Sequence, residues 1–183
     1  IFIKYNLRFN KIVFAFLLFL LIFLSESISI NNVIILQFNN VGEQHVLSSY
    51  FNYIPSYVKL NNGYITLSNK KIKVNSINDK IYLIWNYEFN NTRLMFYGLN
   101  NISKIDLTNF DFEYIYDMNG MFQYCLNLIN IIFPTYSTKN VNTMENLFYG
   151  CISLQSLDLT YFDTSKVSIM RNMFYNCSKL NKI

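Results

Sequence analysis

The sequence predicts an α/β repeat protein in which short parallel strands alternate with short helices. A 26-residue interval runs through the second half of the chain, and each unit combines a two-residue with a three- or four-residue apolar spacing. Runs rich in β-branched residues, without this interval, separate the repeats from an apolar N-terminal segment. Because no single unit can bury its own apolar face, stacked units are needed to form one core. We therefore expect a solenoid with a small β-rich N-terminal cap and an N-terminal hydrophobic helix.

The 26-residue interval is the most specific signal in the sequence. Cys125, Cys151 and Cys177 are separated by 26 residues each, and many apolar residues keep the same interval. A shared period of this length is typical of proteins built from stacked units. The further sets at this interval include Met118, Met144 and Met170; Met95, Met121, Leu147 and Met173; Phe96, Phe122, Phe148 and Phe174; and Leu128, Leu154 and Leu180.

Two apolar spacings alternate within each unit. In the stretch SLQSLDL, Leu157 and Leu159 are two residues apart, as in a short strand with one buried face. In the stretch VSIMRNMFYNC, Val167, Met170 and Phe174 follow at steps of three and four residues, which is the spacing of a helical face. The sequence therefore predicts one short strand and one short helix in every unit.

The stretch LDLTYFDTSKVSIMRNMFYNCSKL resembles the repeat of BspA-like leucine-rich-repeat surface proteins. The preceding unit departs from the pattern of that family at Ile132 and Pro134, and the resemblance covers about residues 89–183. It implies a cell-surface or secreted leucine-rich-repeat solenoid, usually assigned to adhesion or host contact, and it supplies no ligand. The matching residues are Leu157, Asp158, Leu159, Phe162, Asp163, Thr164, Ser165, Val167, Met170, Met173, Phe174, Cys177 and Leu180.

Three parts are predicted along the chain. Residues 1–27 form a secretory segment, residues 28–94 a β-rich capping region, and residues 95–183 the leucine-rich repeats. The middle part is too short to bury much core alone, so we expect it to cover the exposed apolar end of the first repeat. Because the sequence stops within a unit, we expect the repeats to be truncated at the C-terminal end.

Residues 1–27 have the order of a secretory signal peptide. Basic residues precede an apolar run of 13 residues, 12–24, and small residues follow at Ser25 and Ser27. A bilayer span needs about 17–25 apolar residues, which favours a cleaved signal over the alternative, a membrane anchor formed by residues 12–24. We expect a secreted or cell-surface protein that contacts membrane only through this segment, if it is uncleaved. Possible N-glycosylation sites at Asn90, Asn101 and Asn176 agree with this route.

Charge and residue content argue against several classes of function. Residues 1–27 hold three cations and one acid, which leaves a net charge of +2 out of +4 on the rest of the chain. Nucleic-acid binding requires a strongly basic face, so we expect no nucleic-acid partner. The single histidine, His45, lies outside the repeats, and lone cysteines lack the spacing of a zinc site. We therefore expect no enzyme, no catalytic residues, no metal and no cofactor.

The cysteines leave two structural alternatives. An oxidising compartment favours disulfides, yet three thiols cannot all pair, and side chains in a stacked column point in parallel. The equivalent upstream position is occupied by Leu99, which favours a small buried hydrophobic residue at this place in the unit. We expect buried free thiols.

A binding face is predicted on the exposed side of the strands. If Leu157 and Leu159 point inward, the residues that alternate with them point outward. Concave sheets of repeat proteins bind macromolecules, so we expect a binding module for adhesion or for protein or glycan recognition. The alternatives are a structural spacer and a membrane-tethered receptor ectodomain, with no binding role of its own. The expected face consists of Lys104, Asp106, Thr108, Asn130, Ile132, Ser156, Asp158 and Thr160.

Overall fold

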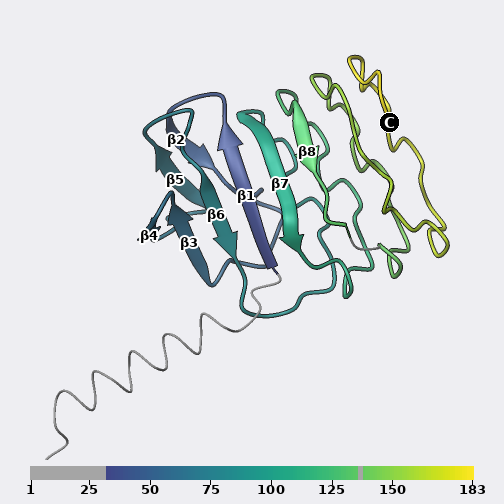
Figure 1. The fold of residues 1–183 in the computed structure, drawn as a ribbon, viewed down its shortest axis with the longest axis horizontal. Coiled ribbons are helices and arrows are strands. Elements are labelled where there is room, and N and C mark those ends of the chain that lie inside the picture. The colour runs from purple at the N-terminus through teal and green to yellow at the C-terminus, as the bar shows by residue number, and fades with distance from the viewer. Residues whose placement is uncertain (1–31, 136–137) are drawn as a thin grey trace, which may run out of the picture. The chain divides into compact units, whose positions relative to one another are not determined.

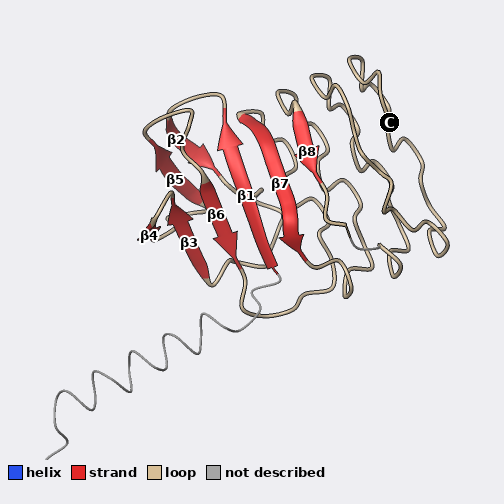
Figure 2. Cartoon of the chain, in the orientation of Figure 1, coloured by secondary structure: helices blue, strands red, loops and turns tan. Residues whose placement is uncertain are grey.

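The described part of the protein is all-β. The computed structural model describes residues 32–135 and 138–183, and these contain strands, turns and loops but no helix (Figure 1 and Figure 2). The predicted secretory segment, residues 1–27, lies outside the described residues. The strands of the described part are β1 (Asn32–Phe38), β2 (Gly42–His45), β3 (Tyr57–Leu60), β4 (Gly63–Ile65), β5 (Lys71–Val74), β6 (Ile81–Ile84), β7 (Ile102–Phe110) and β8 (Asn130–Ile132).

A six-stranded sheet connects the two halves of the described chain, in the order β4-β3-β6-β1-β7-β8. β1 lies between β6 and β7 and is antiparallel to both, with Leu36 opposite Ile105 of β7 (Figure 1). β8 continues the sheet parallel to β7, with Asn130 opposite Lys104. Since β1 precedes residue 94 and β7 follows it, the sheet is continuous across the predicted boundary between cap and repeats.

A second, two-stranded sheet contributes to the core of the first half. β2 and β5 form an antiparallel pair, and Ile72 of β5 joins the same buried cluster as the large sheet. Lys70 holds the loop that follows β2, because its Nζ donates hydrogen bonds to the carbonyl oxygens of Ser48 at 2.8 Å, Ser49 at 3.1 Å and Phe51. Burial lowers the pKa of Lys70. The amine therefore replaces water as the donor to these carbonyl groups.

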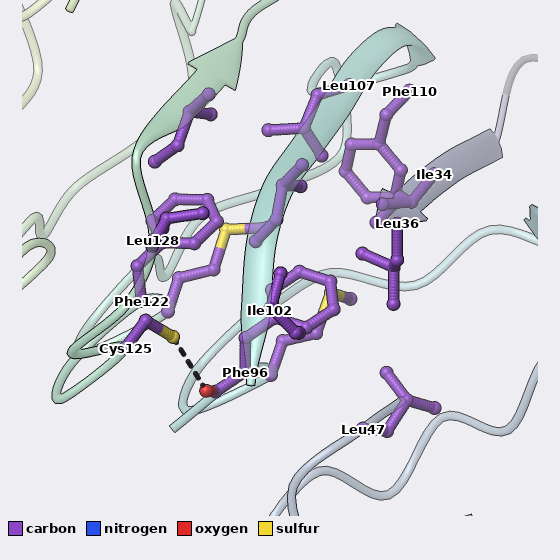
Figure 3. Close-up of a cluster of buried hydrophobic side chains, with 14 of the residues drawn as sticks. Ile34, Leu36, Leu47, Phe96, Ile102, Leu107, Phe110, Phe122, Cys125 and Leu128 are labelled. Atoms are coloured by element: carbon purple, nitrogen blue, oxygen red, sulfur yellow. Dashed lines mark hydrogen bonds between the residues drawn. The ribbon is translucent and has the colours of Figure 1, made fainter. Parts of the chain in front are cut away.

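The hydrophobic core lies between the large sheet and the turns of the second half. Ile34 and Leu36 of β1 and Ile102 of β7 are fully buried. Buried residues two positions apart are expected of a strand with one face on the core. Figure 3 shows these residues in one cluster with Phe96 and Phe122, which come from the turns after residue 90.

Stacked turn segments recur through the second half of the described chain. Parallel bridges join residues 26 apart just before these segments, such as Asp117 to Thr143. Alternate N–H groups of one segment donate to carbonyl groups of the next, as Phe122 does to Leu147 at 3.0 Å. Residues at equivalent positions of successive units therefore lie side by side. The turn segments are residues 92–99, 118–125, 144–151 and 170–177.

Phenylalanine rings run through the interior of the turn segments. Phe96 stacks on Phe122 with 5.9 Å between ring centroids, and Phe122 stacks on Phe148 at 5.5 Å. Phe148 stacks in turn on Phe174 at 5.6 Å. Near-parallel rings at these distances add to the stabilisation that burial alone supplies. The stack explains why phenylalanine recurs at this position of every unit.

The helix predicted for each unit is absent because every turn segment contains two residues with positive φ. In the third segment these are Asn146, at 55°, and Gly150, at 73°. An α-helix requires negative φ at each residue, so a left-handed residue every fourth position prevents it. The N–H groups also bond to the adjacent segment or three residues back, not four. The other positive-φ pairs are Leu94 and Gly98, Gly120 and Tyr124, and Asn172 and Asn176.

The predicted α/β class and leucine-rich-repeat solenoid are therefore wrong. The described residues hold an open sheet whose strands are mostly antiparallel, with no helix on either face. β7 and β8 are the only parallel neighbours in that sheet within the described chain. The strand predicted around Leu157 and Leu159 is reduced to a single bridge between Ser156 and Lys182. The predicted N-terminal hydrophobic helix falls outside the described residues.

Gly150 is a position where the structure requires glycine. Its φ is positive, and a Cβ atom there would lie 2.8 Å from Cδ1 of Tyr124. We predict that Gly150→Ala lowers the free energy of unfolding by about 1–2 kcal/mol from the left-handed backbone alone, with a further loss from the clash. Urea denaturation measures the change.

Gly63→Ala is the matched control, because the nearest atom to its Cβ would be Leu60 O at 3.8 Å, an ordinary contact. Equal loss of stability in the two variants would contradict the explanation for Gly150.

Asp79 fixes the turn between β5 and β6. Its carboxylate accepts hydrogen bonds from the side chain of Asn61 at 3.0 Å and from the N–H groups of Asn75 and Ser76, both at 2.9 Å. These bonds, the one from Asn61 above all, hold the pKa of Asp79 below its usual value of 3.8. The ionised carboxylate is therefore the form that stabilises the fold.

The depressed pKa of Asp79 predicts an acid-dependent loss of stability. The contribution is fully present above about pH 4 and disappears as the pH falls through the lowered pKa, because protonation removes the acceptor charge. We expect the urea midpoint of the wild type to fall more steeply in this acid range than that of Asp79→Asn. Parallel acid dependence in the two chains would contradict the prediction.

Candidate functional site

A pocket of about 260 Å³ lies beside β8, at the outer side of the large sheet. β8 is paired with β7, but no bridge or backbone hydrogen bond of the described chain joins it to residues 156–158, which follow one unit later. The pocket therefore lies where the next strand-to-strand interaction of the sheet is missing. Its lining residues are Asn130, Ile131, Ile132, Phe133, Pro134, Thr135, Ser156, Asp158, Tyr161 and Phe162.

The pocket coincides with a local departure from the repeated sequence. On β7 the Asp106 carboxylate accepts hydrogen bonds from the N–H of Thr108 at 3.0 Å and from its hydroxyl at 2.6 Å. Asp158 makes the same turn with its own threonine, two units later. The unit between them has Ile132 and Pro134 at these positions, so it has no carboxylate, and its proline has no N–H to donate. The pocket thus opens at the unit that lacks the turn.

Asp158 supplies a fixed negative charge at the pocket. It is exposed, and the hydroxyl and N–H of Thr160 donate to its Oδ1 at 2.5 Å and 3.0 Å. These bonds, that of the hydroxyl first, lower the pKa of Asp158, and Lys182 adds a smaller effect in the same direction. The carboxylate is therefore ionised and held in one orientation. Its second oxygen is available to a positively charged or hydrogen-bond-donating ligand.

Aromatic side chains form the apolar wall of the pocket. Phe133 and Phe162 meet edge to face with 4.8 Å between ring centroids, and Tyr161 is half exposed beside them. The pocket therefore offers one carboxylate, several polar groups and an apolar surface. Ligand sites commonly combine an apolar lining with few polar groups that fix orientation.

The residues of the predicted binding face lie in three places in the structure. Asn130, Ile132, Ser156 and Asp158 line the pocket, whereas Lys104, Asp106 and Thr108 lie on β7, and Thr160 lines an adjoining pocket of about 620 Å³. Reasoning from the sequence did not include Phe133 and Tyr161 in this face. The departure at Pro134 from the repeated pattern was the signal that marks the pocket in the sequence.

Residues 90–183, just over half of the chain, match the family described as "Mycoplasma protein of unknown function, DUF285". The chain belongs to the DUF285 family. It is also similar to a protein of Choristoneura biennis entomopoxvirus described as "DNA polymerase", with 34% identity over 109 residues. That similarity covers 56% of this chain and only 11% of the viral protein. No solved structure shows a significant match.

Membership of the DUF285 family replaces the assignment to BspA-like leucine-rich-repeat proteins made from the sequence. The match begins at residue 90, close to where the repeated interval begins. The described part of this region has neither the helices nor the solenoid that the leucine-rich-repeat resemblance implies. The residues quoted for that resemblance instead form the turn segments and the Asp158 turn.

The described residues of this DUF285 protein do not gather metal ligands. Within residues 32–135 and 138–183, no group of three or more His, Cys, Asp and Glu side chains is placed to hold a metal ion. Nor does this part of the chain contain a helix with the length and apolar character that crossing a membrane requires.

The three thiols of the DUF285 region are free and hydrogen-bonded across neighbouring turn segments. Cys125 donates to Phe96 O at 3.0 Å (Figure 3), and Cys151 and Cys177 make the same bond to the preceding unit, both at 3.1 Å. Burial raises the pKa of Cys125 to about 12, and it raises those of Cys151 and Cys177 as well. The thiols are therefore protonated donors that reinforce the stack, and the thiolate needed for nucleophilic attack is suppressed.

The asparagines of the three possible glycosylation sites are exposed. Asn90, Asn101 and Asn176 all lie at the surface, and Asn101 also donates to Gln44 Oε1 at 2.9 Å. Asn176 has positive φ, at 59°, in the last turn segment. Surface exposure is a requirement for glycosylation of such sites.

The three cysteine thiols are expected to differ in reactivity. Cys125 and Cys151 are fully buried and Cys177 is partly exposed, so Ellman's reagent at about pH 8 should modify Cys177 first and the others only after unfolding. Cys177→Ser should abolish the early reaction while leaving two thiols that react in urea. Early modification of all three thiols would contradict the burial argument.

Proposed function

We propose that the protein is a binding module that takes an extended polypeptide segment along the outer edge of β8. The observation that carries the proposal is the missing strand interaction between β8 and residues 156–158, which leaves a pocket beside an unpaired strand edge. Adding a strand to such an edge is a recurring mode of peptide recognition.

The backbone of β8 supports this mode of binding. Lys104 and Asp106 pair with Gln37 and Ile35 of β1, so the backbone groups of Ile105, between them, point to β8. Because Ile105 lies opposite Ile131 in the parallel register, the N–H and C=O groups of Ile131 face away from β7, and no backbone partner for them is present in the described residues. Unpaired groups on a strand edge are available to another chain.

The pocket chemistry indicates the kind of segment. Ile132, Phe133 and Phe162 favour an apolar side chain, and the ionised Asp158 favours a basic or hydrogen-bond-donating side chain. We therefore propose a peptide that alternates apolar and basic residues, because successive side chains of a strand point to opposite sides.

The proposal includes a secreted or cell-surface location, which rests on the order of basic, apolar and small residues in residues 1–27. A structural spacer remains the competing function and predicts no selective ligand. Polymerase activity is not part of the proposal, since the similarity to the viral DNA polymerase covers only 11% of that protein.

Peptide selection on the full chain tests the proposed function. A phage-displayed library of random peptides is selected on immobilised wild-type protein, and the enriched peptides are measured by calorimetry. We predict that Asp158→Asn weakens them about tenfold or more, as loss of a charge-assisted hydrogen bond would. Asparagine retains the Oδ1 acceptor of the Thr160 turn, so the local fold is preserved.

Asp106→Asn is the matched control, because it alters the same type of turn on β7 and Asp106 does not line the pocket. It should leave affinity unchanged. The proposal fails if no peptide is enriched, or if both substitutions have the same effect.

A further inference from the structure

Five tyrosine rings form a continuous row across the turn segments. Ring centroids are 5.4 Å apart between Tyr50 and Tyr97, 5.7 Å between Tyr97 and Tyr124, 5.2 Å between Tyr124 and Tyr149, and 5.0 Å between Tyr149 and Tyr175. The first three contacts are edge to face, so the row presents ring faces and ring edges alternately. The two ends, Tyr50 and Tyr175, are 63% and 61% exposed, whereas the phenylalanine stack lies inside.

The row is maintained where the repeated sequence would interrupt it. The position equivalent to Tyr97 and Tyr149 is Gln123 in the second turn segment, and the ring comes instead from Tyr124, the next residue. Tyr124 has positive φ, at 59°, an unfavourable conformation for a bulky residue. Its ring occupies space above Gly150, where a Cβ would approach Cδ1 to 2.8 Å. Two unusual local features thus combine to keep the row unbroken.

The sequence around each ring of the row is uncharged. Each of the five rings lies in a stretch without Asp, Glu, Lys, Arg or His: residues 46–58, 94–103, 118–138, 146–157 and 172–178. Three cations near the row are engaged: Lys70 donates to carbonyl groups on both sides of Tyr50, Arg93 pairs with Asp117, and Arg171 pairs with Glu145. Lys179, four residues after Tyr175, is exposed. Exposed neutral amides, among them Asn100 and Asn172, lie in the same stretches.

We propose that this tyrosine row is a binding surface for a neutral polysaccharide chain. Sugar rings have apolar C–H faces that pack on phenol rings, and their hydroxyl groups exchange hydrogen bonds with phenol and carboxamide groups. An uncharged polymer is the occupant that matches a surface with few charged residues, whereas a nucleic acid requires many cations for its phosphates. Successive rings about 5 Å apart offer contacts to successive sugars along the chain.

This surface is independent of the proposed peptide site. The row is built from the cap loop and the turn segments, and none of its five tyrosines lines the pocket beside β8. Asp158→Asn is therefore expected to leave polysaccharide binding unchanged, so each proposal can fail without the other.

Surface plasmon resonance with the full 183-residue chain tests the inference. The probes are soluble neutral polysaccharides (laminarin, hydroxyethylcellulose, pullulan and galactomannan), with heparin and poly(dT) as charged comparisons. We expect binding to at least one neutral polymer, weakened about two- to tenfold for each ring removed. The test variants are Tyr50→Ser with Tyr175→Ser, at the exposed ends, and Tyr149→Leu, within the row.

Tyr64→Ser and Tyr116→Ser are the matched controls, because these tyrosines are 66% and 47% exposed but lie outside the row. They should leave affinity unchanged, and circular dichroism checks that all variants fold. The inference is overturned if no neutral polymer binds, if only heparin or poly(dT) binds, or if row and control variants lose affinity equally.

Discussion

The pairing of β1 with β7 is the interaction on which the rest of the structure depends. A stack of turn segments cannot bury its own first apolar face, because each unit obtains its neighbours from the next. β1 supplies that missing neighbour: Leu36 lies opposite Ile105, and both are fully buried. The N–H of Ser48 completes the closure by donating to Met95 O in the first turn segment. The first half of the chain is therefore part of one core with the second.

The sequence indicated which residues lie beside which, but not the local backbone. Stacked rings such as Phe122 and Phe148 follow directly from the 26-residue interval. The three- and four-residue spacing suggested helices because consecutive tight turns bring side chains to one face at similar steps. The distinguishing signal was glycine or asparagine at positions such as Asn146 and Gly150, which tolerate positive φ. A tyrosine at the equivalent position, Tyr124, obscured it.

In the candidate site, too, the repeated sequence pattern predicted only part of the structure. Alternation in the strands correctly suggested exposure of Ser156 and Asp158. The pocket itself arises where the pattern fails, because Ile132 and Pro134 cannot make the aspartate–threonine turn. A consensus sequence of the units therefore does not reveal the site. A unit that departs from its neighbours has different hydrogen-bonding capacity, and its surface differs accordingly.

The peptide dipoles of the turn segments also point in a common direction along the stack. The carbonyl of Asp117 accepts from Thr92, while the N–H of Met118, in the same peptide group, donates to Thr143. Alternate peptide dipoles are thus aligned along the stack, and aligned dipoles add as they do in a helix. The segment 170–177 presents the positive ends of this array, since its alternate N–H groups have no acceptor in the described chain. Within the described residues, the field of the stack is therefore positive towards residues 170–177 and negative towards residues 92–99.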